Sequence, residues 1–210
     1  PNLALANGAT DANLFQHQVY LEKFSADKVL KLSPLIRVPT AGLGFYSNKI
    51  KSLDELKKGD IITLANDPTN LARALRFLAK LDLLTIKKDI DPTKASEKDI
   101  DQNPRGLVFK PLEAAQLPRT LDTAAASVVN GNYAIAAGLN LSSALKLEVL
   151  DENLKNLVAV KTEDLNKPFV NDIKAVVESE EFLAVVTDPK RVFSSFQRPE
   201  WIVVRLASKK

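Results

Sequence analysis

Hydrophobic residues along the chain alternate between two patterns. Short aliphatic runs at residues 29–32, 61–65, 107–110 and 157–160 are typical of buried strands. Between these runs, apolar residues recur every three to four positions, which is typical of helices that bury one face. Strands that alternate with helices predict an α/β fold with largely parallel sheets.

The clearest helix is predicted to begin at Pro68. Asp67 is a good N-cap, and Pro68 fits the first helical position because its missing N–H needs no partner there. Leu71 and Leu75 mark an apolar face at helical spacing, and Arg73 is expected to lie off that face. The sequence therefore places Arg73 close to a helix N-terminus.

Three further segments contain sequence signals of local structure. Ser52 and Glu55 form a capping box, in which the serine is expected to accept from the backbone of Glu55 and to start a short helix. A second proline-started helix is predicted from Pro168 towards Glu180. The polar, turn-rich segment 89–104 is expected to be a surface connection.

Composition and charge narrow the possible functions. With 210 residues, 45% of them hydrophobic, the chain can form one large domain or two small lobes. Its 29 basic and 26 acidic residues are scattered, so a concentrated nucleic-acid-binding patch is not expected. The absence of cysteine excludes thiol chemistry, and the single histidine, His17, argues against a histidine-rich metal site.

Arg73 is the most informative candidate for ligand binding. A helix N-terminus carries free N–H groups and partial positive charge, and a guanidinium adds a two-pronged donor for a carboxylate. Asn66, Thr69 and Asn70 add polar groups at the same strand-to-helix turn, where α/β folds bind ligands. The competing interpretation is a solvated surface arginine.

A second cluster lies at residues 13–20 and holds two aromatic residues and the histidine. Phe15 and Tyr20 could contact an apolar or thioether side chain, because sulfur–ring contacts are favourable. Alternatively, both rings belong to an ordinary core and His17 is a buried, hydrogen-bonded histidine.

Five segments carry a resemblance to a known family. The segments are Ala-Leu-Ala-Asn-Gly at 4–8, Asp-Ala-Asn-Leu-Phe-Gln-His at 11–17, Tyr-Ser-Asn-Lys-Ile-Lys-Ser at 46–52, Asn-Asp-Pro-Thr-Asn-Leu-Ala-Arg at 66–73 and Glu-Ala-Ala-Gln-Leu-Pro-Arg-Thr-Leu-Asp at 113–122. In this order they resemble the motifs of the NlpA lipoproteins, the methionine-binding solute-binding components of bacterial methionine ABC importers. The resemblance extends from residue 1 to about residue 164.

The resemblance implies a two-lobed α/β fold of the type 2 periplasmic-binding-protein class, which closes on its ligand. The chain is then expected to lack the N-terminal strand and helix of lobe one. Residues 1–45 are assigned to lobe one, residues 46–156 to lobe two, and residues 157–210 to the return into lobe one and a C-terminal tail.

The resemblance also implies a ligand site between the lobes. Arg73 would bind the ligand carboxylate with Asn70 nearby, and Asn130 and Asn156 would bind the amino and carboxylate groups. The remaining four residues would surround the ligand side chain: Phe15, His17, Tyr20 and Tyr46. For each asparagine, the alternative role is capping of a turn.

Two departures from the family motifs concern the ligand. Gln18 and Val19 replace the usual Lys-Pro, and Gly131 and Asn132 replace a threonine-rich pair. Free L-methionine is the expected ligand, and a methionine-containing dipeptide or another apolar amino acid stays an alternative.

The expected role is capture without chemistry, with no catalytic residue, cofactor or metal. The expected partner is an ABC permease with its ATPase subunit, and the chain is expected to be a monomer that binds no nucleic acid. A lipid anchor upstream of Pro1 would hold it at the periplasmic or cell-surface side of a membrane. The alternatives are a ligand-sensing domain of a regulator, an enzyme that uses carboxylates, and an adhesin.

Overall fold

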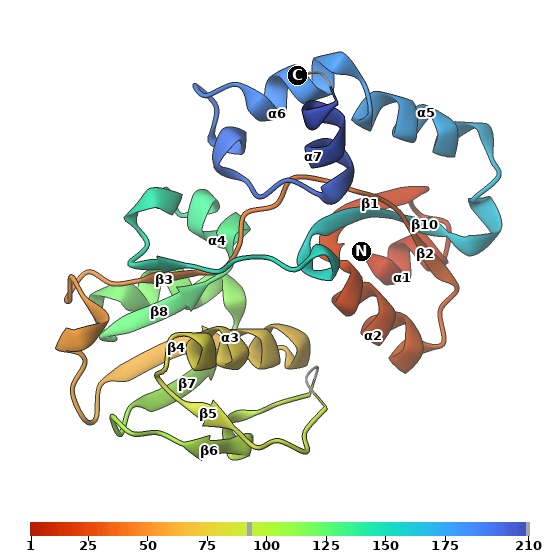
Figure 1. Cartoon of the computed structure of the whole chain (residues 1–210). Coiled ribbons are helices and arrows are strands. Elements are labelled where there is room, and N and C mark those ends of the chain that lie inside the picture. Colours follow the sequence, from red (N-terminus) through yellow and green to blue (C-terminus); the bar gives the residue numbers. More distant parts are fainter. Residues whose placement is uncertain (92–93, 209–210) are drawn as a thin grey trace. The chain divides into compact units, whose positions relative to one another are not determined.

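The computed structural model describes residues 1–91 and 94–208. The chain forms two compact units, each with its own sheet (Figure 1). Unit 1 contains Pro1–Thr40 and Val149–Lys210, and unit 2 contains Ala41–Glu148. From the sequence, the chain was expected to pass from lobe one to lobe two after residue 45 and to return after residue 156. In the structure it leaves unit 1 after Thr40 and returns to it after Glu148.

Unit 1 is built on a three-stranded antiparallel sheet in the order β1-β10-β2. Its strands are β1 (Ala12–His17), β10 (Asn156–Lys161) and β2 (Leu32–Arg37). The central strand β10 is buried along Leu157 to Val160, because strands pair with it on both sides and helices cover both faces of the sheet (Figure 1).

Helices lie on both faces of this sheet (Figure 1). On one face, Leu5 and Leu21 pack with Leu157 and Ala159 of β10. On the other, Leu183, Val186 and Ile202 form a second small cluster. The helices are α1 (Asn2–Ala6), α2 (Gln18–Lys28), α5 (Pro168–Val177), α6 (Glu180–Thr187) and α7 (Glu200–Ala207), with 3-10 turns at Glu152–Leu154, Thr162–Asp164 and Val192–Ser195.

Unit 2 contains a five-stranded sheet in the order β7-β4-β8-β3-β9. Strand β4 (Ile61–Ala65) runs parallel to both β7 (Val108–Leu112) and β8 (Ala126–Val129). Strand β3 (Gly44–Tyr46) is antiparallel to β8 and to β9 (Lys146–Leu147). The sheet is therefore mixed, with three adjacent parallel strands.

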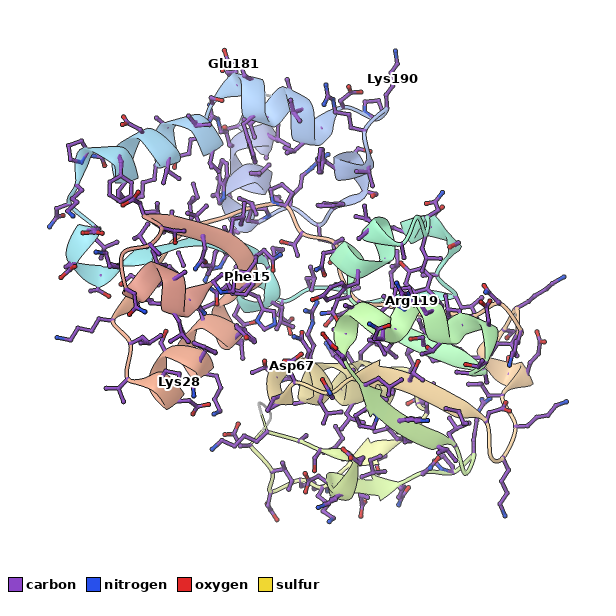
Figure 2. The ribbon with its side chains drawn as sticks, turned by 180° about the vertical axis from the view of Figure 1, so that it is seen from behind. Phe15, Lys28, Asp67, Arg119, Glu181 and Lys190 are labelled. Atoms are coloured by element: carbon purple, nitrogen blue, oxygen red, sulfur yellow. The ribbon has the colours of Figure 1, made fainter. Side chains whose placement is uncertain are left out.

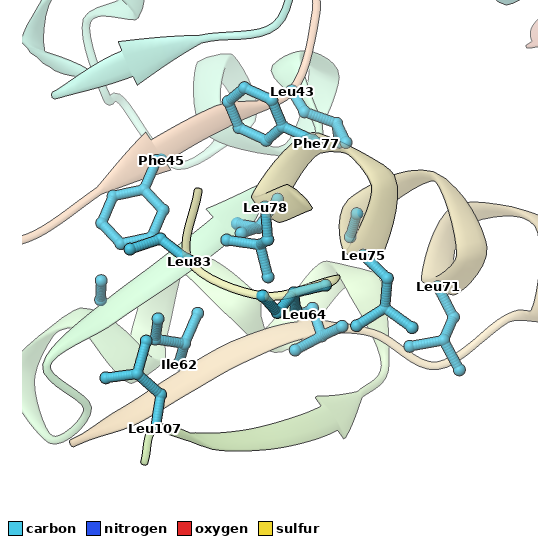
Figure 3. Close-up of a cluster of buried hydrophobic side chains, with 14 of the residues drawn as sticks. Leu43, Phe45, Ile62, Leu64, Leu71, Leu75, Phe77, Leu78, Leu83 and Leu107 are labelled. Carbon is cyan, nitrogen blue, oxygen red and sulfur yellow. The ribbon is translucent and has the colours of Figure 1, made fainter. Parts of the chain in front are cut away.

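Crossover segments connect the parallel strands of unit 2. Helix α3 (Pro68–Lys80) follows β4 and packs its apolar face on the sheet, and Leu64, Leu75 and Leu78 are fully buried there (Figure 3). The other elements of this unit are α4 (Gly131–Ala136), the hairpin strands β5 (Thr85–Ile86) and β6 (Ile100–Gln102), and 3-10 segments at Leu53–Glu55, Glu97–Asp99, Ala114–Asp122 and Leu141–Ser143.

Some of the predicted elements differ from the structure. The strand predicted at 29–32 is wrong: Val29 is the left-handed C-cap of α2, and β2 begins only at Leu32. Ser52 accepts from Asp54 instead of Glu55, because the segment forms a tight 3-10 turn and not an α-helix. The helix from Pro168 ends at Val177, and a separate helix begins at Glu180.

Two other observations bear on the predictions. The polar segment 89–104 contains a 3-10 turn and strand β6, and residues 92–93 within it lie outside the described residues. Among the helices that are described, none has the length and apolar character needed to span a bilayer.

Candidate ligand-binding site

The start of α3 and the start of α4 lie at the same edge of the unit 2 sheet. Strands β4 and β8 are adjacent and parallel, with Ile62 opposite Ala126 and Thr63 opposite Ser127. Helix α3 follows the carboxyl end of β4, and α4 follows the carboxyl end of β8. The carboxyl edge of parallel strands is where α/β folds bind ligands.

Asp67 organises the first turn of α3, as the sequence predicted. Its carboxylate accepts from the backbone N–H of Asn70 at 3.1 Å and from the Thr69 hydroxyl at 3.1 Å. The Asn70 side-chain nitrogen also donates to both carboxylate oxygens, at 3.0 Å each. Figure 2 shows Asp67 at the beginning of this helix.

Asn130, the N-cap of α4, is joined to this network. Its side-chain nitrogen donates to Asn70 Oδ1 at 3.1 Å, so two residues 60 positions apart are in direct contact. Asn130 Oδ1 is buried and has no hydrogen-bond partner among the described residues. A buried acceptor of this kind is uncommon and fits a donor from a bound molecule.

Arg73 is buried and ion-paired, with 5% of its surface exposed. This burial excludes the alternative of a solvated surface arginine, and the side chain already has one carboxylate partner within the chain. Glu148 accepts from Arg73 Nε at 2.9 and 3.1 Å and from Nη2 at 2.5 Å. These bonds use Nε and Nη2 of the guanidinium, and none of them uses the Nη1 donors.

Glu148 has a second role at the boundary of unit 2. Its carboxylate accepts from the Leu43 backbone N–H at 3.0 Å, and its own N–H donates to the Leu43 carbonyl at 2.8 Å. The ion pair thus joins α3 to the first and last segments of the unit. Glu148 was not predicted from the sequence, since no local pattern links it to an arginine 75 residues earlier.

Tyr46 is buried in unit 2, and its hydroxyl has no hydrogen-bond partner within the described chain. Burial raises the pKa of this hydroxyl above its usual value. The ring lies over Gly44, where a Cβ would come within 2.2 Å of Tyr46 Cε2. Because Gly44 pairs with Val129, the hydroxyl reaches towards the end of β8 that precedes Asn130.

In unit 1, the structure brings together three of the four residues predicted there. The Phe15 and Tyr20 rings meet edge to face at 6.0 Å between centroids, and the His17 and Tyr20 rings do so at 6.4 Å. His17 is buried and its Nδ1 caps α2 by accepting from the Tyr20 N–H at 3.1 Å. Phe15 remains 40% exposed.

Asn156 lies beside this cluster at the start of β10. It is directly opposite His17 in the β1–β10 pairing. Its backbone N–H donates to the Thr40 hydroxyl at 2.8 Å, and its carbonyl accepts from the Val38 N–H at 2.8 Å. Each unit therefore contains its own group of predicted site residues: Phe15, His17, Tyr20 and Asn156 in unit 1, and Tyr46, Asn70, Arg73 and Asn130 in unit 2.

Neither group has the composition of a metal site within the described residues. Within residues 1–91 and 94–208, no three or more histidine, aspartate and glutamate side chains are arranged to hold a metal ion. The unit 2 group instead offers donors on Arg73 and an acceptor on Asn130, which suits a ligand that carries both an anionic and a cationic group.

Several known proteins are similar to this chain in sequence and in structure. The model of the family described as NlpA lipoprotein matches residues 1–200. Outer membrane lipoprotein 3 of Mannheimia haemolytica is 42% identical over 182 residues, covering 86% of this chain and 69% of that protein. The D-methionine-binding lipoprotein MetQ of Escherichia coli strain K12 is 37% identical over 186 residues, covering 86% of this chain and 68% of MetQ.

A solved structure confirms the predicted fold class. A nutrient-binding protein from Burkholderia cenocepacia, determined bound to methionine, superimposes with a TM-score of 0.85 at 36% identity. The superposition covers 90% of this chain and 79% of the other.

Proposed function

Because this chain belongs to the NlpA lipoprotein family, we propose that it is the solute-binding component of an ABC importer and captures free L-methionine. It acts at the periplasmic or cell-surface side of a membrane, to which a lipid anchor holds it. It delivers its ligand as a monomer to a permease with an ATPase subunit. Its role is binding without chemical change of the ligand.

The observation that carries this proposal is the pairing of opposite hydrogen-bonding groups in unit 2. An amino acid has a carboxylate that needs donors and an ammonium that needs acceptors. Arg73 offers its Nη1 side to the carboxylate, and the unpartnered Asn130 Oδ1 accepts from the ammonium. Asn70 acts through Asn130, since its own amide already bonds Asp67 and Asn130.

The remaining residues supply selectivity for the side chain. Phe15, His17 and Tyr20 form a small aromatic group whose edges suit a thioether. Tyr46 contributes a ring in unit 2, and Asn156 adds polar groups beside His17. Names of relatives support methionine as the ligand, because one is called a D-methionine-binding lipoprotein and another was determined with methionine bound.

Paired alanine variants test the two groups of residues separately. Asn130→Ala removes the buried acceptor and should weaken L-methionine binding at least tenfold in a calorimetric titration, about 1.4 kcal/mol. Asn132→Ala is the matched control, because Asn132 is exposed two residues further on. Equal affinities for the two variants would contradict the assignment of Asn130.

Phe15 and its neighbour Leu14 provide the second pair. Both are exposed apolar residues on β1, at 40% and 54%. Phe15→Ala should weaken L-methionine binding by a larger factor than it weakens binding of alanine, which has no thioether to contact the ring. Leu14→Ala should change neither, and an effect of Leu14→Ala as large as that of Phe15→Ala would remove Phe15 from the site.

A further inference from the structure

We propose that Asp67 is a positioning residue that determines specificity for the ligand ammonium. Asp67, in an inference that rests on the proposed function, determines which atom of the Asn130 amide faces the ligand. Asp67 is linked to Asn130 through Asn70, and its side chain is half-buried at the start of α3.

The first step is the orientation of Asn70. An ionised carboxylate can only accept hydrogen bonds. Both oxygens of Asp67 lie 3.0 Å from the side-chain nitrogen of Asn70. The NH2 group of Asn70 must therefore point at Asp67, and its Oδ1 must point away from it.

The second step transfers this orientation to Asn130. Asn70 Oδ1 is an acceptor, so the atom of Asn130 that lies 3.1 Å from it must be the donor Nδ2. Asn130 Oδ1 is then the atom left over, buried and without a partner among the described residues. The two orientations of the Asn130 amide have nearly the same shape. The charge on Asp67 determines which of them is adopted.

The consequence is a site of defined polarity. With Oδ1 presented, Asn130 accepts from an ammonium. With the amide reversed, an NH2 group would face the ammonium, and two donors would oppose each other. Asp67 therefore favours ligands with a free amino group over analogues without one.

Asp67→Asn isolates this effect from helix capping. Asparagine is as good an N-cap as aspartate, so the bond to the Asn70 N–H is retained. The new NH2 group, however, faces the Asn70 amide and favours the reversed orientation of both Asn70 and Asn130. Asp67→Ser, which also caps a helix but has no carboxylate, is the second variant if Asp67→Asn does not fold.

The binding experiment compares L-methionine with its des-amino analogue, 4-(methylthio)butanoate, by calorimetry. We expect the wild-type protein to bind L-methionine more tightly than the analogue. In either Asp67 variant, the ratio of the two affinities should fall at least tenfold. Asp99→Asn is the control, since it removes the same charge from unit 2 at another capping position, where Asp99 accepts from the Ser96 N–H and hydroxyl at 2.8 Å.

A second readout needs no ligand. In the wild-type protein, a scalar coupling across the hydrogen bond should link Asn130 Nδ2 to the side-chain carbonyl carbon of Asn70. In Asp67→Asn the coupling should run from Asn70 Nδ2 to the carbonyl carbon of Asn130.

The outcomes separate this inference from the proposed function. An unchanged preference in both Asp67 variants, or the reversed coupling in the wild-type protein, would overturn the role of Asp67 alone. Failure of the wild-type protein to bind L-methionine would overturn the proposed function and, with it, the specificity assigned to Asp67.

Discussion

Removal of one partner from the Arg73–Glu148 ion pair should destabilise unit 2 strongly. Both side chains are 6% exposed, and three hydrogen bonds of 2.5 to 3.1 Å join them. Arg73→Met leaves a buried carboxylate without its charged partner, and Glu148→Leu leaves a buried guanidinium. Each substitution is expected to lower the free energy of unfolding by about 3–5 kcal/mol.

The double variant should be far more stable than the sum of the single variants. Arg73→Met with Glu148→Leu removes both charges, so no buried charge is left uncompensated. The Leu43 N–H still loses its acceptor, which costs about 1–3 kcal/mol. The double-mutant cycle should therefore give a favourable coupling of at least about 3 kcal/mol.

Urea unfolding followed by far-ultraviolet circular dichroism measures these differences. Trp201, the single tryptophan, lies in unit 1, so its fluorescence reports on the unit that does not contain the pair. We expect the variants to shift the transition followed by circular dichroism. Where Trp201 fluorescence shows a separate transition, we expect that transition to stay unchanged. Additive effects of the two substitutions would refute the claim that the residues stabilise unit 2 as a pair.

Two other predictions concern pH and a close contact. The Lys167 ammonium, 2.6 Å from Asp164 Oδ1, lowers the pKa of this buried carboxyl, so its charged form stabilises the fold above the unfolded pKa of about 3.9. This stabilisation is lost as pH falls from about 5. Asp164→Asn should therefore flatten the acid side of the stability curve, and an unchanged acid slope would contradict this. Gly44→Ala should cost about 1–3 kcal/mol of unfolding free energy, because the new methyl would overlap the Tyr46 ring. Gly8→Ala, with φ +74° and no described atom within 4 Å of the new methyl, should cost about 1 kcal/mol from backbone strain, and a larger cost there than at Gly44 would contradict the predicted contact.

Local signals allowed parts of the fold to be predicted. The start of α3 was predicted because Asp67 and Pro68 act within one turn, and its apolar face follows from spacing alone. Strand β2 was misplaced because an apolar run at Val29 is not part of a strand, while Pro34 lies inside the real one. Pro34 is tolerated because β2 is an edge strand of the described sheet.

The site was predictable only in part. Motif resemblance selected Asn70, Arg73 and Asn130, and the structure places Asn70 and Asn130 in contact. The partner of Arg73 was not predictable, since Glu148 comes from the far end of unit 2. Such pairings depend on tertiary structure, and local periodicity contains no information about them.

The central claim, capture of free methionine, is tested most directly by calorimetric titration of the wild-type protein with L-methionine, D-methionine and glycyl-methionine. The account predicts saturable binding of one L-methionine per chain, tighter than binding of the dipeptide, because a free ammonium and carboxylate on one carbon match Asn130 and Arg73. No heat of binding with any of the three ligands, or tighter binding of glycyl-methionine, would contradict it.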